Sequence, residues 1–453
     1  MANEASISLR EALSYWLKLG FISFGGPAGQ IAIMHQELVE KRRWISEARF
    51  LHALNYCMLL PGPEAQQLAT YIGWLMHGVK GGLIAGALFV LPSLLILIGL
   101  SWLYVNFGHT PVISGLLYGI KPTVTAIVAF AAWRIGSRVL KNGFLWALAI
   151  LAFTAIFFFK IPFPWIVFGA ALIGIIAGNL KPDWFNEDRH AKSLESFGPA
   201  VIDDLTPLPD HARFSPRRIA LIAAIGLALW AGVLVLLGGW SGVPSTLAQM
   251  GWFFTQAALL TFGGAYAVLP YVYQGAVEQY QWLTAHAMID GLALGETTPG
   301  PLIMIVAFVG YLGGVTKEIF GADHGFAAGV AGASVATFFT FLPSFLFILV
   351  GGPLVEATRN NLKFTAPLNA ITAAVVGVIV NLALFFAWHI LWPNASEAAP
   401  FSGKFEWFAL PIGIIAGIAL IRYKVNVMTV IAAGGLVGLA YSLLLGGDSG
   451  RIN

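Results

Sequence analysis

Phe24-Gly25-Gly26-Pro27 and Pro61-Gly62-Pro63 are the two motifs around which this sequence is organised. Both return in the second half of the chain, as Phe262-Gly263-Gly264 and Pro299-Gly300-Pro301. One constant offset in residue number, which takes Phe24 to Phe262, superimposes the two copies without a gap. Because glycines and prolines match at fixed spacing over such a distance, the pattern indicates an internal duplication.

A third motif extends the duplication beyond these stretches. Leu91-Pro92-Ser93 recurs as Leu342-Pro343-Ser344, but with a larger offset than the first two motifs. The second copy therefore holds an insertion of 13 residues, which we place around Thr316 to Ala328. Between the first two motifs, the original offset also aligns Glu40 with Glu278, Trp44 with Trp282 and Ala69 with Ala307.

The composition defines the class of protein. Of 453 residues, 58% are hydrophobic and 10% are charged, and the mean hydropathy is +0.78. A soluble globular protein carries about 25% charged residues. Uncharged runs such as residues 83–107 and 144–159 are typical of membrane-spanning helices, and barrel strands lack such runs. The sequence thus predicts an all-α polytopic membrane protein.

Other kinds of chemistry find little support in the sequence. The lone Cys57 cannot form an intrachain disulfide, and residues 1–11 contain no apolar run that would form a cleavable signal peptide. The nine histidines show no metal-ligand spacing, and no phosphate-binding glycine loop indicates direct use of ATP. We expect no cofactor, no metal site and no nucleic-acid partner.

The apolar segments predict four domains. Residues 1–180 form an N-terminal membrane repeat, 181–218 a polar cytoplasmic linker, 219–240 a connecting helix and 241–453 a C-terminal repeat. Each repeat has two interrupted segments followed by about four spans of roughly 20 residues. The interrupted segments are 12–34, 53–76, 247–272 and 286–314; the spans are 82–105, 113–134, 144–159, 162–179, 219–238, 325–351, 366–391, 405–420 and 425–446.

The interrupted segments are expected to be re-entrant hairpins. Two prolines around a glycine remove helix hydrogen bonds. Each arm beside a break has about 11–13 residues, or roughly 16–20 Å of helix, which reaches only the middle of a bilayer. The alternative is a kinked helix that crosses the membrane completely.

The distribution of basic residues predicts that the two repeats are inverted. Residues 35–52 contain four Lys or Arg, whereas their counterpart, residues 273–290, contains none. Basic loops stay in the cytoplasm. With one extra helix between the repeats, the N-terminus is then cytoplasmic and the C-terminus periplasmic. Inverted repeats with broken helices are the architecture of secondary transporters.

These motifs, together with the basic loop and its tryptophan, resemble the chromate ion transporter (CHR) family, in its long, two-domain form. The resemblance implies a permease of the bacterial inner membrane that exports chromate, an analogue of sulfate, and confers chromate resistance. The second copy has Ala265 where the first has Pro27. The family's signature positions fall on Phe24, Gly25, Gly26, Pro27, Pro61, Gly62, Pro63, Phe262, Gly263, Gly264, Pro299, Gly300 and Pro301.

The broken helices are the predicted site for a tetrahedral dianion. A helix that begins at the membrane midplane offers free N–H groups and the positive end of its dipole. Glycine lets the backbone approach an ion, and Pro63 and Pro301 suit a first helical turn. The alternative is that these glycines and prolines only kink and pack helices. Further donors are expected from Ser23, Asn55, Gln66, Thr261, Thr297 and Thr298.

Three charged residues at membrane depth are candidates for coupling. Glu64 lies in the first turn of an arm and Glu296 near the C-terminal end of another, where the dipole disfavours a carboxylate. The hypothesis is that one or both bind a proton as the anion binds; otherwise each is neutral and hydrogen-bonded, or faces a water-filled mouth. Lys121 either attracts the dianion or extends to the outer face.

Several alternatives stay open at the level of sequence. The protein could import sulfate or another oxyanion, or act as a passive anion channel. An intramembrane enzyme is disfavoured because no nucleophile–base pair stands beside Glu64 or Glu296. The expected partners are chromate, sulfate as a second substrate or competitor, protons as coupling ions, and the lipid bilayer. The oligomeric state is not readable, and a homodimer is one arrangement left open.

Overall fold

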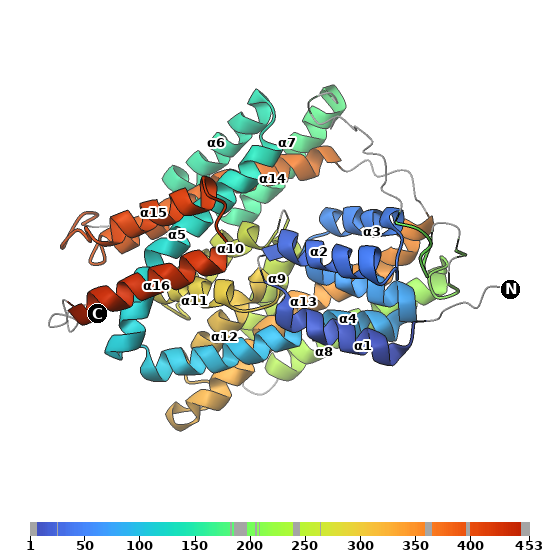
Figure 1. Ribbon diagram of the computed structural model, residues 1–453, viewed down its shortest axis with the longest axis horizontal. Helices are drawn as coiled ribbons and strands as arrows, with labels where there is room; N and C mark the ends of the chain where they lie inside the picture. The colour runs from blue at the N-terminus through green and yellow to red at the C-terminus, as the bar shows by residue number, and fades with distance from the viewer. Residues whose placement is uncertain are drawn as a thin grey trace.

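The structure is a computed structural model that describes residues 7–24, 26–181, 184, 197–203, 206–207, 209–238, 245–262, 264–357, 365–395 and 399–444. Within these residues the chain is helical and contains no β-strand, apart from one isolated parallel bridge between Ile45 and Ile202. The helices pack into one elongated bundle, in which some lie along the long axis and others cross it obliquely (Figure 1). The prediction of an all-α protein is confirmed.

In the part of the chain that the structure describes, seven helices are long and apolar enough to cross a membrane. This confirms a multi-pass membrane protein, because each of them reaches the roughly 20 residues that a bilayer requires. The seven are α4 (Glu64–Phe107), α5 (Pro111–Val139), α7 (Phe163–Leu180), α8 (Pro216–Gly238), α13 (Gly325–Ala357), α14 (Thr365–Leu391) and α16 (Val427–Leu444). Shorter apolar helices are α6 (Gly143–Phe159), α12 (Ile305–Thr316) and α15 (Ala409–Ile421).

The first repeat begins with four short elements. α1 (Leu9–Ile22) and α2 (Gly26–His35) flank the first break, and α3 (Glu47–Leu59) precedes the break at residues 60–63. Ser8 and Ser46 cap α1 and α3, since each hydroxyl accepts a hydrogen bond from the third residue that follows it. The π-helical turn η1 (Gln36–Lys41) continues α2.

The second repeat has the same order of elements. Its short helices are α9 (Thr246–Leu260), α10 (Ala265–Tyr273), η3 (Gln274–Gln279), α11 (Ala285–Thr297) and η4 (Leu302–Met304), followed by α12 and α13. Even the irregular features recur, because η1 and η3 begin at equivalent residues of the two copies. Arg43 and Gln281, also at equivalent positions, both have positive φ angles, of 56° and 51°. The duplication is therefore visible in the structure as well as in the sequence.

The long helix α4 consists of two arms that meet at His77 and Gly78, where the Gly78 φ angle is 62°. The arms pack against one another through glycines, since a Cβ on Gly73 would lie 2.6 Å from the carbonyl oxygen of Gly81. In the second repeat, α12 and α13 pack in the same way at Gly310 and Gly332. Their connection, residues 317–324 with η5 (Ala322–His324), contains much of the expected insertion.

One end of the molecule gathers segments of the first repeat. The His77 ring donates a hydrogen bond from Nε2 to the carbonyl oxygen of Ile7 at 2.9 Å, and Arg42 pairs with Glu11 at 3.3 Å. The linker reaches the same end, where His211 contacts the Trp74 carbonyl at 2.8 Å and Ile202 pairs with the backbone beside Ile45. The start of α1, the residues that follow η1, the turn at His77 and Gly78, and the linker residues Ile202 and His211 thus lie together.

The equivalent segments of the second repeat gather at the other end. The N–H of Phe163, which begins α7, donates to Gln274 of η3 at 3.2 Å. Tyr104, near the end of α4, donates to Asp290 of α11 at 2.9 Å, and Tyr118 of α5 donates to Glu406 at 2.8 Å. These contacts join η3, α11 and the chain before α15 in the second repeat to α7, α4 and α5 of the first.

Candidate functional site

The breaks of the two copies are joined by reciprocal backbone hydrogen bonds. The Gly300 N–H donates to the carbonyl oxygen of Ser23 at 2.8 Å, and the Gly62 N–H donates to that of Thr261 at 2.7 Å. Ser23 and Thr261 occupy equivalent positions in the two copies, and so do Gly62 and Gly300. Such exchange is what a two-fold axis produces. It also means that these two N–H groups already have acceptors in this arrangement.

Glycine is required at both of these positions. The φ angles of Gly62 and Gly300 are 126° and 107°, values that side chains rarely allow. A Cβ on Gly62 would lie 2.5 Å from Ser344 Oγ, and one on Gly300 would lie 2.8 Å from Ser93 Cβ. Each central glycine thus faces the serine of the repeated Leu-Pro-Ser motif in the other copy.

Three buried glutamines lie in this region. The amide nitrogen of Gln30 donates to the carbonyl of Gly300 at 2.6 Å and to that of Ser23 at 3.2 Å, so it bridges the two copies. Gln67 donates to Pro61 at 2.8 Å, and Gln66 to Thr70 at 3.0 Å. We refer to Ser23, Gln30, Gln66, Gln67, Ser93 and Ser344 as the central polar cluster; all six are buried.

The central polar cluster contains atoms without partners. In the part of the chain that the structure describes, Ser93 Oγ and the amide oxygens of Gln30, Gln66 and Gln67 are buried and make no hydrogen bond. Leaving such a group unsatisfied costs about 1–3 kcal/mol. A serine hydroxyl can donate, and a glutamine can present its NH2 after a half-turn. The cluster is therefore chemically able to bind water or an oxyanion.

The site is asymmetric although its backbone is duplicated. Positions equivalent to Gln30, Gln66 and Gln67 are Val268, Met304 and Ile305 in the second copy. Glu64 is likewise replaced by Leu302, and Glu296 stands where the first copy has Met58. The first copy thus supplies the amides, and each copy supplies one carboxylate.

The hydroxyl donors expected from the sequence are already in use. Ser23 and Thr261 donate to the carbonyls of Leu19 and Ala257, both at 2.6 Å. Thr297 and Thr298 donate at 2.9 Å to carbonyls three residues earlier. These hydroxyls cap carbonyl groups at the C-terminal ends of α1, α9 and α11, so in this arrangement they stabilise the helix ends at the breaks.

The remaining predicted residues occupy the borders of the breaks. Gly26 and Gly264 begin α2 and α10 with φ angles of 73° and 98°, whereas Phe24 is 37% exposed. Asn55 is exposed on α3 and is not part of the central polar cluster. Gly25 and Gly263 lie outside the described residues. Pro27, Pro61, Pro63, Phe262, Pro299 and Pro301 flank the breaks, and of these Pro63, Pro299 and Pro301 are buried.

The two carboxylates belong to helices that border the breaks. Glu296 accepts a short hydrogen bond from the Tyr266 hydroxyl, beside a small void that is also lined by Leu292 and Leu302. Glu64 is half-buried in the first turn of α4. Neither carboxylate belongs to an ion pair that the structure describes.

Lys121 forms an ion pair instead of extending to solvent. Its Nζ lies 3.4 Å from Asp290 Oδ2, and that same oxygen accepts the hydrogen bond from Tyr104. Asp290 is 3% exposed and was not singled out by the sequence analysis. It was detectable, because it is an acidic residue inside the interrupted segment 286–314. Ser93 and Ser344 were also detectable from their repeated motif, whereas nothing local marks Gln30 or Gln67.

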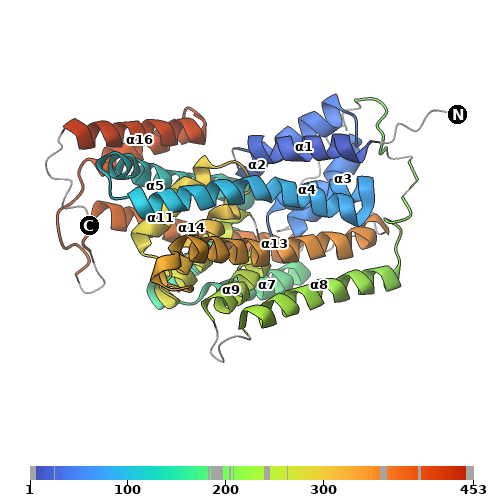
Figure 2. The same cartoon turned by 90° about the horizontal axis from the view of Figure 1, so that it is seen from below.

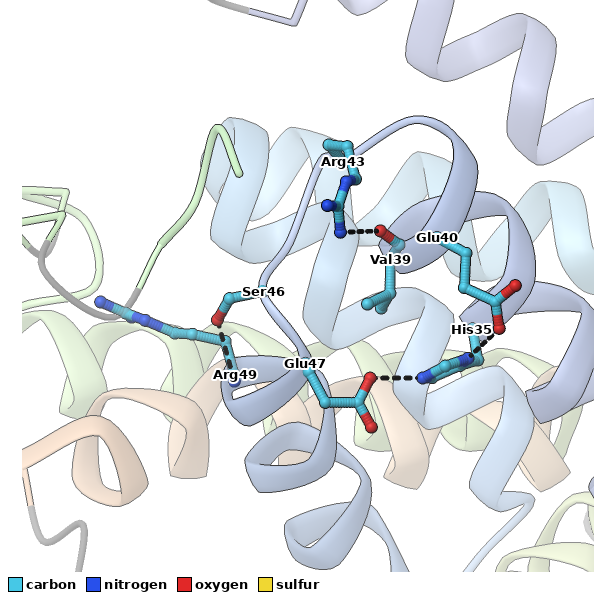
Figure 3. Close-up of polar contacts among 7 residues, drawn as sticks. All are labelled: His35, Val39, Glu40, Arg43, Ser46, Glu47 and Arg49. Carbon is cyan, nitrogen blue, oxygen red and sulfur yellow. Dashed lines mark hydrogen bonds and ion pairs between the residues drawn. The ribbon is translucent and has the colours of Figure 1, made fainter. Parts of the chain in front are cut away.

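A second polar group lies at the end near the linker, away from the breaks. Figure 3 shows His35 between two carboxylates, with Glu40 at 3.1 Å and Glu47 at 2.5 Å. Because these contacts fix η1 to the start of α3, they are structural. Among the described residues, no three His, Cys, Asp or Glu side chains are grouped as a metal site would require.

A large cavity lies apart from the polar groups. It has a volume of about 670 Å³ between α5, α6, α14 and α15, and its lining includes Trp133, Trp146, Val380 and Leu384. The lining is almost entirely apolar, which suits lipid chains more than an ion.

Comparison with known proteins identifies relatives along nearly the whole chain. The family described as Chromate transporter matches residues 10–175 and 248–439. A chromate transport protein of Pseudomonas aeruginosa is 32% identical over 444 residues, which cover 95% of this chain and 92% of the relative. One of Cupriavidus metallidurans is 28% identical over 96% of this chain and 94% of the relative. The uncharacterized transporter YwrB of Bacillus subtilis is 29% identical over 33% of this chain and 75% of its own. No solved structure matches.

Proposed function

The chain belongs to the chromate transporter family, and we propose that it exports chromate across the bacterial inner membrane and thereby confers chromate resistance. Family membership makes it a transport protein, not an enzyme. The export direction follows from the resistance that the resemblance implies, and the central polar cluster is the proposed site for the ion.

One observation carries the assignment of the site. Reciprocal hydrogen bonds join the breaks of the two copies beside four buried polar atoms without partners in the described chain. A dianion in a low dielectric requires several donors around it. When the copies separate at the breaks, the N–H groups of Gly62 and Gly300 lose their carbonyl acceptors and become such donors. The present arrangement is then the closed form.

The proposed membrane topology is two inverted repeats with re-entrant hairpins. α1 and α3 have 14 and 13 residues, or about 20 Å of helix, which is less than the hydrocarbon thickness of about 30 Å. Glu11, Arg42 and the Gly78 turn lie at one end although the breaks between them lie in the interior. Because Lys41, Arg42 and Arg43 are also there, this end is cytoplasmic. The C-terminus is then periplasmic.

The domain division follows the same topology. Residues 1–180 and 241–453 are the two repeats, 181–218 is the cytoplasmic linker and 219–240 is the connecting helix. α8 provides the odd crossing that inverts the second repeat. Part of the linker lies outside the described residues, but residues 197–203 and 209–212 pack against the first repeat.

The membrane potential supports export. It contributes about 2.3 kcal/mol per charge per 100 mV, so a dianion gains about 4.6 kcal/mol when it leaves a negative interior. That energy corresponds to roughly three orders of magnitude in concentration. Glu64 and Glu296 repel an anion at the cluster when both are ionised, so we assign them neutral states while the ion is bound.

The test is the flux of radiolabelled chromate in everted membrane vesicles. Uptake that sulfate inhibits and that Gly62→Leu abolishes would support export through the central polar cluster. Sulfate movement in the opposite direction, without chromate uptake, would replace the proposal with an oxyanion importer. Single-channel currents in planar bilayers would replace it with a passive channel. A protonophore added to the vesicles separates proton coupling from coupling to the potential alone.

A further inference from the structure

Asp290 is a buried carboxylate with only half of its hydrogen-bonding capacity used. Its Oδ2 atom accepts from Tyr104 at 2.9 Å and pairs with Lys121 at 3.4 Å. Its Oδ1 atom is buried and has no partner among the residues that the structure describes. Lys121 itself retains 20% side-chain exposure. A buried carboxylate with one strong cationic partner is charged only while that partner stays.

A second buried cluster in the same molecule provides the contrast. Glu356 of α13 accepts from Tyr71 at 2.6 Å with Oε1 and from Arg49 at 3.2 Å with Oε2. Both oxygens are satisfied, and Arg49 also donates to the Thr206 carbonyl at 3.0 Å. A guanidinium does not lose its proton in a protein, and its planar fork holds several acceptors at once. Arg49 and Glu356 are therefore expected to stay paired with one another.

The two clusters join equivalent elements at opposite ends of the interface between copies. Arg49–Glu356 joins α3 of the first copy to the end of α13, and Asp290–Tyr104 joins α11 of the second copy to the end of α4. α3 and α11 are equivalent in the repeat, as are the ends of α4 and α13. Glu356, which is nearer the linker, is thus paired with an arginine, whereas Asp290 is paired with a lysine.

Asp290 of the lysine cluster lies on α11, the helix that ends at one of the breaks. Asp290 precedes Glu296 by six residues on α11, or about 9 Å along the helix axis. Lys121 is a point charge on a flexible stem, so it can pair with a carboxylate or with an oxyanion. If an anion takes Lys121, Asp290 is left buried without a cation, an unfavourable state unless the carboxylate binds a proton.

The surroundings of Asp290 contain few other titratable groups. α4 contributes Tyr104, α5 contributes Lys121, and α14 contributes His389, whose ring lies 6.2 Å from that of His286 on α11. Among the other elements packed on α11, η4 has no titratable residue, α12 has only Tyr311 and α16 only Tyr441. Tyr441 stacks on Tyr118 and Phe408. Within the described residues of these elements, no second lysine or arginine pairs with Asp290.

We propose that Asp290 is a proton-binding site of the transport cycle: an oxyanion that pairs with Lys121 displaces the Asp290 carboxylate, which binds one proton. When the anion leaves, Lys121 and Asp290 pair again and the proton is released. This inference rests on the proposed oxyanion transport and adds a coupling residue and a coupling ion to it. In this step Asp290 binds one proton for each anion that pairs with Lys121.

The experiment measures proton uptake when chromate is added to the purified protein in lightly buffered detergent solution with a pH-indicator dye, with chromate binding measured in parallel by equilibrium dialysis. The wild type is compared with Asp290→Asn and with Lys121→Gln/Asp290→Asn, which removes both charges and leaves neither unpaired. Glu356→Gln is the matched control for a change in a buried acidic group. Because all variants receive the same anion, its own proton equilibrium cancels.

The expected result is that proton uptake per bound chromate falls by one in Asp290→Asn or in the double variant, while binding persists. Glu356→Gln should retain the proton uptake of the wild type. Unchanged uptake in the Asp290 variants, or no uptake in the wild type despite bound chromate, would overturn the inference and leave the proposed function standing. A wild type that binds neither chromate nor sulfate would overturn both.

Discussion

The backbone N–H of Gly300 donates to the carbonyl oxygen of Ser23, in the other half of the chain, at 2.8 Å. The equivalent residues Gly62 and Thr261 make the same bond in the opposite sense, at 2.7 Å. The break in each copy therefore donates a backbone hydrogen bond to the break in the other copy, and the Ser23 carbonyl accepts a second bond, at 3.2 Å, from Gln30 of its own copy. Water does not reach such groups in a bilayer, so these reciprocal hydrogen bonds fix the position of one copy relative to the other.

Substitution of the central glycines should strongly reduce transport. Gly62→Ala and Gly300→Ala place a Cβ at a positive φ angle and within 2.8 Å of a serine of the other copy. The strain is about 1–3 kcal/mol at each site. Vesicle flux should fall by about fivefold to a hundredfold, since about 1.4 kcal/mol is a factor of ten. Gly99→Ala in α4 is the control, because its Cβ meets nothing within 4 Å; equal losses in all three would contradict the assignment.

Removal of the Gln30 amide should weaken transport without unfolding the protein. Gln30→Met keeps the length of the side chain but leaves the carbonyls of Gly300 and Ser23 without this donor, at a cost of about 1–3 kcal/mol. We expect a raised KM for chromate flux and an unchanged elution volume in size-exclusion chromatography. Gln279→Met, at an exposed position of η3, should resemble the wild type. A wild-type KM in Gln30→Met would remove this residue from the site.

The carboxylates beside the cluster should make transport depend on pH. An ionised Glu64 or Glu296 repels the dianion, so the KM of the wild type should rise with pH as these groups lose their protons. Glu64→Gln and Glu296→Gln mimic the neutral state and should flatten this dependence. The measurement is the KM for chromate across a series of pH values. If both variants keep the pH profile and the rate of the wild type, neither carboxylate takes part.

Disruption of the Arg49–Glu356 pair should destabilise the protein strongly. Both side chains are almost fully buried, with exposures of 4% and 1%, so Arg49→Ala leaves a buried carboxylate without its cation. The expected cost is about 3–5 kcal/mol, seen as a lower Tm in fluorescence-detected size-exclusion chromatography. Arg213→Ala breaks an ion pair of exposed groups and should cost less than about 1 kcal/mol. If Tm falls by a similar amount in both variants, the buried ion pair contributes no more to stability than the exposed one.

Local chemistry made the position of the breaks predictable. Proline removes a hydrogen bond from a helix and glycine permits positive φ angles, so the motifs themselves interrupt the chain. Accordingly, α1 ends at Ile22 before the first motif, and α3 ends at Leu59 before the second. The helical class and the membrane location followed from long uncharged runs, because no other environment accepts them.

The partners of the site could not be predicted, because they depend on packing between the copies. No local pattern indicates that the Gly300 N–H is taken by Ser23, or that Lys121 pairs with Asp290 instead of reaching the membrane surface. The same holds for Gln30, which is an ordinary polar residue of α2 until the second copy places a carbonyl beside its amide. Periodicity and spacing describe neighbours along the chain, whereas these contacts join residues from opposite halves of it.

The weak packing of α8 indicates that other contacts hold the two halves of the molecule together. Among its residues only Gly226 is buried, and the helix lies along the edge of the molecule (Figure 2). A helix that packs so little serves as a tether, which keeps each half at a high effective concentration for the other. A protease nick between α7 and α8 should then leave a single particle, because the halves are bound where their breaks meet. The two halves then behave like two different subunits that are joined by a covalent linker.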